Sequence, residues 1–247
     1  GRVNTVTGKP YRDDPTIMAW QLANEPRPGG TAAFGARNMA VFQRWVRDTS
    51  KLIKTLDPRH LVSTGGEGLK GCLESEACVL DAHRPDTIDY VTAHVWPNNW
   101  GWIDPKNQPA TYEAGEARCR DYVTRHIAIA RQLGKPLVIE EFGLIREARA
   151  FAPGSATADK DRFYQAIYGL ALEDMKAGGP TAGTNFWAWN GEGRAQHPDA
   201  WFASGDKSFV GDPPQEEQGL YGVFDTDAST LAVIAEHAAA VKALGRQ

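Results

Sequence analysis

Short apolar runs alternate with longer amphipathic segments along most of the 247-residue chain. Each short run is bounded by Pro, Gly or polar residues and is too short for a helix with its own caps, so we predict buried strands. The five predicted strands cover residues 16–23, 61–64, 88–95, 137–142 and 184–189. Between the strands, apolar residues recur at the spacing of one helix face. The predicted helices cover residues 38–56, 113–133, 159–176 and 229–244.

This alternation of strands and helices predicts an α/β protein with a parallel sheet. Right-handed crossovers leave two architectures, a doubly wound sheet or a closed barrel. One connection is far longer than an ordinary loop between a strand and a helix, because residues 190–227 form a single Gly/Pro-rich stretch. We expect this long segment to pack across one side of a cleft. Its aromatic residues are Trp201, Phe202, Phe209 and Tyr221.

A glutamate stands at the carboxyl end of two predicted strands. Glu25 follows the run 16–23, and Glu141 closes the run 137–142. In a barrel of parallel strands, this end is the active-site face. Cleavage of a glycosidic bond with retention needs a carboxylic acid and a carboxylate about 5 Å apart. One such glutamate alone is more often a helix-start or salt-bridge residue, but charges at two apolar strand ends are costly without a purpose. We therefore predict that Glu25 and Glu141 are catalytic.

Three further residues at strand ends are candidates to support this pair. Asn24 precedes Glu25 and could donate a hydrogen bond to a sugar hydroxyl, although Asn also simply starts turns. His94 lies at a third strand end, where a neutral imidazole can hydrogen-bond a carboxylate or substrate; a lone His is more often structural. Trp187, on the last predicted strand, is the expected stacking platform for a sugar, with a place in the core as the alternative.

Composition and charge narrow the expected partners. A formal net charge of -4, a pI near 5.9 and the absence of a basic stripe give no reason to expect nucleic acid. Eight Trp and seven Tyr residues suit a site for sugars, whose flat apolar faces stack on aromatic rings. No apolar run approaches the roughly 18 residues of a membrane span, so we expect no membrane partner.

The other motifs predict neither a cofactor nor a metal. The glycines of residues 65–68 lack the spacing of a nucleotide or phosphate loop, which favours a turn with a close backbone approach. Cys72, Cys78 and Cys119 lack the spacing of a zinc site, and no His pair accompanies them. Cys72 and Cys78 either close a small disulfide loop in an exported protein or stay as two free thiols.

Several sequence blocks resemble glycoside hydrolase family 5. Residues 20–27 are Trp-Gln-Leu-Ala-Asn-Glu-Pro-Arg, and residues 185–191 are Asn-Phe-Trp-Ala-Trp-Asn-Gly. Between them lie Ala-His-Val-Trp at 93–96 and Ile-Glu-Glu-Phe-Gly at 139–143. The blocks at 13–17, 212–219 and 223–230 are similar to the β-mannan-degrading branch of this family. The resemblance covers the whole chain.

The resemblance implies a (β/α)8 barrel and a retaining mechanism. By position, Glu25 matches the general acid/base of the family, and Glu141 matches its nucleophile. Asn24, His94, Trp187 and Trp189 fall in the blocks that bind substrate. Trp96 stands where the family usually has Tyr, which puts in doubt any role of a phenol hydroxyl near the nucleophile, because an indole can only donate through its ring nitrogen.

The same resemblance implies that part of the barrel is not in this chain. The acid/base of the family closes the fourth strand, whereas Glu25 ends the first strand predicted here. We therefore expect residues 1–247 to be the carboxyl-terminal part of a single barrel domain, supplying about the last five βα units. The first three units belong to the missing amino-terminal segment. We expect the full protein to be secreted or periplasmic.

The expected substrate is a mannan-derived oligosaccharide or polysaccharide. The amino-acid sequence of the segment 190–227 is similar to that of exo-acting members of the family, so we predict a β-mannosidase that releases mannose from non-reducing ends. An endo-β-1,4-mannanase is the alternative. A β-1,4-glucanase of the same family and a catalytically silent carbohydrate-binding barrel are further alternatives; the second would need no pair of acid and nucleophile.

Overall fold

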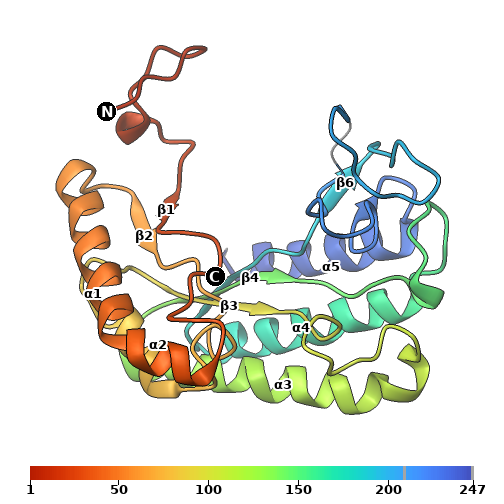
Figure 1. The fold of residues 1–247 in the computed structure, drawn as a ribbon, viewed down its shortest axis with the longest axis horizontal. Coiled ribbons are helices and arrows are strands. Elements are labelled where there is room, and N and C mark those ends of the chain that lie inside the picture. Colours follow the sequence, from red (N-terminus) through yellow and green to blue (C-terminus); the bar gives the residue numbers. More distant parts are fainter. Residues whose placement is uncertain (208–209, 246–247) are drawn as a thin grey trace. The chain divides into compact units, whose positions relative to one another are not determined.

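The computed structural model describes residues 1–207 and 210–245, which form two compact units (Figure 1). The three strands β3, β4 and β5 begin in the first unit and end in the second. The first unit comprises residues 1–94, 125–138 and 180–182; the second comprises 95–124, 139–179 and the described residues from 183 onward.

Helices and short parallel strands alternate through both units. The helices are α1 (Ala32–Leu56), α2 (Glu76–His83), α3 (Gln108–Leu133), α4 (Ala158–Lys176) and α5 (Ala228–Leu244), with short 3-10 helices at η1 (Tyr11–Asp13) and η2 (Glu147–Arg149). The strands are β1 (Ala19–Gln21), β2 (Leu61–Ser63), β3 (Val91–Val95), β4 (Leu137–Phe142), β5 (Thr181–Thr184), β6 (Trp189–Gly191) and β7 (Val223–Phe224). They pair as β1-β2, β3-β4-β5 and β6-β7, and the first and last of these pairs are parallel. None of the helices in the described part of the chain has the length and apolar character needed to cross a membrane.

The predicted strands are present, with one correction. Strand β4 has the predicted bounds, and the other strands are shorter than the apolar runs that predicted them. The prediction of one strand over 184–189 was wrong, because β5 ends at Thr184 and β6 begins at Trp189. Between them, the backbone N–H groups of Asn185 and Trp187 donate to Ile139 and Phe142 at 2.8 and 3.0 Å without forming a regular ladder.

Two helices begin more than one turn earlier than their apolar pattern predicts. Helix α1 starts at Ala32, because the Thr31 side chain caps it by accepting the Phe34 N–H at 3.3 Å. Helix α3 starts at Gln108, which is buried together with Tyr112 on the helix face that the later turns also bury. Sequence analysis missed α2, a short helix whose apolar residues do not form one clear stripe.

In the first unit, a buried carboxylate ties the start of β1 to the turn before β2. Asp57 accepts a hydrogen bond from the Trp20 indole at 2.8 Å and lies 2.6 Å from His60 Nδ1. The other His60 nitrogen faces the Asp14 carbonyl at 3.1 Å, so both ring nitrogens meet acceptors. The hydrogen bond to Asp57 therefore raises the pKa of His60. Burial alone would raise the pKa of Asp57, but the hydrogen bonds from Trp20, His60 and nearby backbone outweigh it and lower this pKa to about 2.

We expect the substitution Asp57→Asn to remove a pH-dependent part of the stability. A carboxylate with a lowered pKa stabilises the fold above its unfolded pKa, near 4, and loses this effect as the pH falls toward 2. The difference in free energy of unfolding between the two proteins should therefore shrink by about 2 kcal/mol from pH 5 to pH 2. Urea titrations at several pH values measure this difference. Asp48→Asn, at an exposed carboxylate, is the control, and a difference for Asp57→Asn that does not change with pH would contradict the account.

Candidate active site

Glu25 lies on a tight turn four residues beyond the end of β1. Its backbone has a left-handed φ of 49°, which non-glycine residues adopt only when the surroundings hold them there. Its N–H donates to the Gly65 carbonyl at 2.9 Å, which fixes the turn to the end of β2. The side chain is 24% exposed, so it can meet both protein and solvent.

A histidine and an arginine hold the Glu25 carboxylate. Oε1 lies 2.8 Å from Nδ1 of His94, a residue of β3 that is almost completely buried. Oε2 lies 3.5 Å from the guanidinium of Arg27. Arg27 also pairs with the buried Glu67 at 2.6 Å, so one cation lies between two carboxylates. The predicted proximity of His94 to a carboxylate is thus present in this unit, and Asn24 lies exposed beside Glu25.

Sequence analysis missed Arg27 and Glu67. Arg27 directly follows the Asn-Glu-Pro block, and Glu67 is a charged residue inside a Gly-rich strand end, as Glu25 is a charged residue at another strand end. A charged residue at the end of an apolar strand is the signal that could have identified Glu67.

The loop of residues 65–68 confirms the predicted close backbone approach. A Cβ atom on Gly65, whose φ is +70°, would lie 2.1 Å from the Ala23 carbonyl oxygen. A Cβ on Gly68, whose φ is +90°, would lie 2.0 Å from Nε2 of His126. Gly65 therefore allows the loop to approach the chain just before Glu25, and Gly68 allows it to approach the His126 ring.

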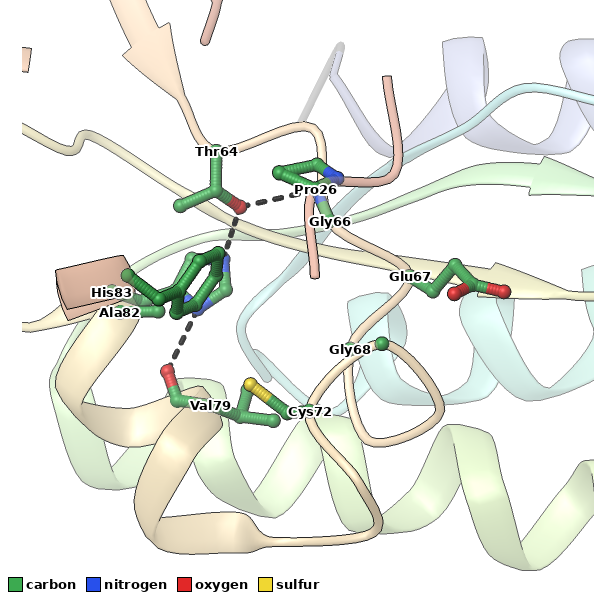
Figure 2. A pocket seen from close by; sticks show the side chains of 11 residues that line it. Pro26, Thr64, Gly66, Glu67, Gly68, Cys72, Val79, Ala82 and His83 are labelled. Atoms are coloured by element: carbon green, nitrogen blue, oxygen red, sulfur yellow. Dashed lines mark hydrogen bonds between the residues drawn. The ribbon is translucent and has the colours of Figure 1, made fainter. Parts of the chain in front are cut away.

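A buried histidine supports this loop from below (Figure 2). The Thr64 hydroxyl bridges the Gly66 N–H, at 3.2 Å, and Nε2 of His83, at 2.9 Å. The Val79 carbonyl meets the other nitrogen of His83 at 2.8 Å. Burial lowers the pKa of His83 to about 4, so this imidazole is neutral near pH 7. The adjoining cavity is only about 10 Å³, room for about one water molecule, and therefore belongs to the support of the loop.

A disulfide lies in the same region. Cys72 and Cys78 are bonded, which settles the two alternatives that the sequence left open. Cys119 is a buried free thiol.

In the second unit, Glu141 receives a hydrogen bond from an indole. It lies near the end of β4 and is partly buried, whereas its neighbour Glu140 is more deeply buried. Nε1 of Trp96, the residue directly after β3, donates to Oε2 of Glu141 at 3.3 Å. Trp96 stands where the family usually has Tyr, and its indole nitrogen thus supplies a hydrogen-bond donor to Glu141 in place of a phenol hydroxyl.

The predicted aromatic platforms differ in exposure. Trp187 packs edge-on against Trp96, with ring centroids 6.2 Å apart, and is partly buried. Trp189 on β6 is 56% exposed. In the long segment, Trp201 is exposed and Tyr221 is buried, while Phe209 lies outside the described residues. Tyr221 belongs to a buried cluster of this unit that includes Trp96.

Comparisons with known proteins identify the family of this chain. A family model described as GH family 5 beta-mannosidase-like matches residues 1–246. Mannan endo-1,4-beta-mannosidase 4 of Solanum lycopersicum is 32% identical over 210 residues, which are 81% of this chain and 49% of that protein.

Solved structures give the same result. A glycoside hydrolase family 5 mannosidase from Rhizomucor miehei is 33% identical, with a TM-score of 0.84 over 100% of this chain and 56% of that one. The endo-beta-1,4-mannanase of Thermotoga petrophila is 28% identical, with a TM-score of 0.64 over 96% of this chain and 46% of that one. The chain therefore spans about half the length of the relatives that it matches.

We expect Gly65→Ala to disrupt the turn that carries Glu25. The added Cβ would meet a backbone carbonyl at 2.1 Å, which cannot move without displacing the chain before Glu25. Gly134→Ala is the matched control, because Gly134 has a similar φ of +64° and nothing within 4 Å of the added atom. The control should lose about 1 kcal/mol of unfolding free energy from the left-handed backbone alone. Gly65→Ala should lose a further 1–3 kcal/mol, as measured by urea denaturation, and equal losses would refute the clash.

Proposed function

Because the chain belongs to glycoside hydrolase family 5, we propose that the full protein hydrolyses β-1,4-mannosidic bonds with retention of configuration. The observation that carries this proposal is the setting of two glutamates at strand ends. Glu25 meets His94 in one unit, and Glu141 accepts the Trp96 indole N–H in the other. A protein that only bound carbohydrate would need neither of these carboxylates.

In this proposal Glu25 is the acid/base and Glu141 is the nucleophile. Glu25 protonates the leaving oxygen while Glu141 attacks the anomeric carbon, and Glu25 then removes a proton from the water that releases the sugar. The nucleophile must be ionised, and a donated hydrogen bond favours the ionised form of Glu141. His94 orients Glu25 through its ring nitrogen.

We assign substrate binding to residues beside these two glutamates. Asn24 offers an exposed amide next to Glu25, and Trp189 offers an exposed indole face on which a pyranose can stack. The other residues of this group are His94, Trp96 and Trp187. We propose mannan-derived saccharides as substrates, since a variant of the Rhizomucor miehei mannosidase was crystallised with mannosyl-fructose.

We further propose that residues 1–247 are the carboxyl-terminal part of one (β/α)8 barrel domain. The described part of the first unit supports this, because β1 lies at an edge of its sheet and β2 is its partner there. Large apolar side chains nearby are exposed, among them Met18, Val41, Leu52 and Leu56. Such surface normally packs against further structure. A secreted or periplasmic location is proposed from the Cys72–Cys78 disulfide, since such bonds persist in oxidising compartments.

Exo action is our proposal for the cleavage mode. The TM-score is 0.84 with a protein named a mannosidase and 0.64 with one named an endo-mannanase. The segment 190–227 is also held by its own contacts, such as those of His197 with Asp206 at 2.9 Å and Arg194 with Asp225 at 2.6 Å, so it can act as a fixed wall. Endo action is the second candidate, because the curated relatives are named mannan endo-1,4-beta-mannosidases.

A mechanism-based label tests the two catalytic roles. With the full-length protein, a 2-deoxy-2-fluoro mannoside that has an activated leaving group should form a covalent adduct on Glu141, because fluorine slows the second step. Glu140→Gln is the matched control and should still be labelled at Glu141. Glu25→Ala should also be labelled, since an activated leaving group needs no acid, but it should lose at least about 100-fold activity on natural mannosides. Mass spectrometry of peptides locates the label, and an adduct on Glu140 would overturn the assignment.

Comparing aryl mannosides with aryl glucosides tests the glucanase alternative.

A product time course on mannohexaose tests exo action. If segment 190–227 closes the cleft beyond the terminal sugar, the full-length enzyme should first release mannose and mannopentaose. Early mannobiose and mannotriose would instead support the endo-mannanase. Chromatography of the products over the first few per cent of conversion distinguishes the two.

A further inference from the structure

The Trp96 indole is closely packed in the second unit. The Tyr221 ring packs edge-on against it, with centroids 5.0 Å apart and planes at 81°. On Gly143, two residues after Glu141, an added Cβ would lie 2.8 Å from Cζ3 of Trp96 and 3.2 Å from Cδ1 of Tyr221. The absence of a side chain at residue 143 therefore gives the two rings their room.

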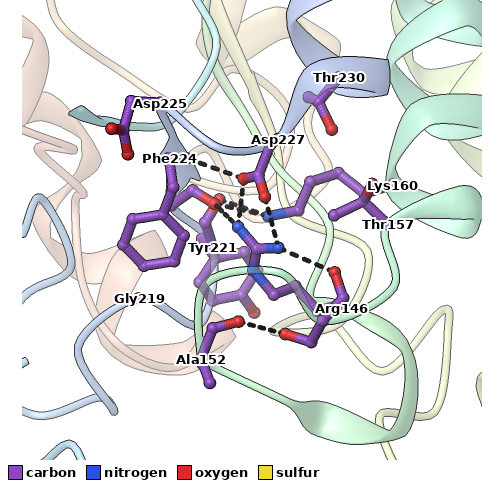
Figure 3. A network of polar contacts seen from close by, with 12 residues as sticks. Arg146, Ala152, Thr157, Lys160, Gly219, Tyr221, Phe224, Asp225, Asp227 and Thr230 are labelled. Atoms are coloured by element: carbon purple, nitrogen blue, oxygen red, sulfur yellow. Dashed lines mark hydrogen bonds and ion pairs between the residues drawn. The ribbon is translucent and has the colours of Figure 1, made fainter. Parts of the chain in front are cut away.

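Both backbone polar groups of Tyr221 have partners. Its N–H donates to the Asp212 carboxylate at 3.2 Å. Its carbonyl accepts from the Lys160 ammonium at 2.9 Å (Figure 3). Its hydroxyl donates to the Asn99 side chain, whose amide donates to Glu216 at 3.2 Å. Backbone and ring are thus both fixed.

The charges beneath Tyr221 are fully buried. Arg146 forms a two-pronged ion pair with Asp227, and both Arg146 and Lys160 donate to the Gly222 carbonyl at 3.0 and 2.9 Å (Figure 3). Burial, together with the nearby Arg146 charge, lowers the pKa of Lys160 to about 7. Cations in such a place are tolerated only while these carbonyl and carboxylate partners stay in position.

An indole needs such packing more than a phenol does. A phenol hydroxyl lies on the axis of ring rotation, whereas the indole N–H lies off that axis and changes direction when the ring turns. The N–H of Trp96 can therefore point at Glu141 only if its neighbours fix the ring.

We propose that Tyr221 and Gly143 are positioning residues that aim the Trp96 N–H at the carboxylate of Glu141. The inference rests on the proposed function only in taking Glu141 as the nucleophile. The hydrogen bond between the Trp96 indole and the Glu141 carboxylate does not depend on that function. Removal of the Tyr221 ring should let the indole turn, and a Cβ on residue 143 should push it aside. The carboxylate would then lose a donor to its charged form and ionise at a higher pH.

The coupling can be measured without substrate. In ¹⁵N-labelled full-length protein, the indole N–H signal of Trp96, assigned by its loss in Trp96→Phe, should shift with pH as Glu141 ionises. Glu141→Gln should abolish this shift. In Tyr221→Leu and in Gly143→Ala the amplitude of the shift should fall about twofold or more, and its midpoint should rise by about half a pH unit.

Matched variants separate positioning from general destabilisation. Tyr221→Phe keeps the ring and should keep most of the shift. Gly169→Ala, where an added Cβ meets nothing within 4 Å, should leave the shift unchanged. If Tyr221→Leu does not fold, Gly143→Ala answers the question at the second residue that contacts the ring. A full shift with an unchanged midpoint in both Tyr221→Leu and Gly143→Ala, or no response of Trp96 to Glu141 in the unaltered protein, overturns the inference.

Enzyme kinetics distinguish this result from a failure of the proposed function. If the protein hydrolyses mannosides, the acidic limb of kcat/KM should move to higher pH in Tyr221→Leu as in Trp96→Phe, and the double variant should show no further movement. An unaltered limb counts against the positioning role. An unaltered protein that hydrolyses no mannoside counts against the proposed function alone.

Discussion

Backbone groups in irregular segments need partners when they are buried, and in both units charged side chains supply them. In the first unit, the partly buried Lys135 donates to three carbonyl groups between the end of α2 and the start of β3. In the second, the buried Arg146 and Lys160 donate to carbonyl groups just before β7. Burying such charges is unfavourable unless every partner stays in place. The chain before β7, whose Tyr221 packs against the ring that hydrogen-bonds Glu141, is therefore held by interactions that tolerate little movement, which suits residues that must be oriented for chemistry.

The sequence allowed the order of strands and helices to be predicted, because alternating short apolar runs and amphipathic stretches are local signals. It did not show where β5 ends and β6 begins, because residues 185–188 are as apolar as a strand but pair irregularly with β4. The early start of α1 depends on a cap by Thr31, and that of α3 depends on burial of Gln108. Burial of Gln108 is decided by contacts with residues far along the chain. The local spacing of apolar residues carries no information about such contacts.

Some residues of the candidate site could likewise be identified from the sequence, and others could not. Glu25, His94 and Glu141 could be identified because each stands at the end of an apolar strand, where a polar residue is conspicuous. The partners that orient them were not identifiable: Glu67 is linked to Glu25 through Arg27, and Tyr221 meets Trp96 across 125 residues of sequence. The burial of Tyr221 could not be predicted either, since an aromatic residue in a Gly/Pro-rich stretch gives no sign of being buried.

The burial of Tyr221 divides the long segment into two parts with different freedom to change. The outer part, around Arg194 to Asp206, is largely exposed and includes Trp201, so its length can vary at little cost to the core. The inner part, from Asp212 to Phe224, is clamped by Lys160 and Arg146 and presses on the ring that hydrogen-bonds Glu141. A change in the inner part would therefore also loosen the donor to Glu141. The outer part makes no such contact with the ring among the described residues, so it can change while the carboxylate keeps its partner.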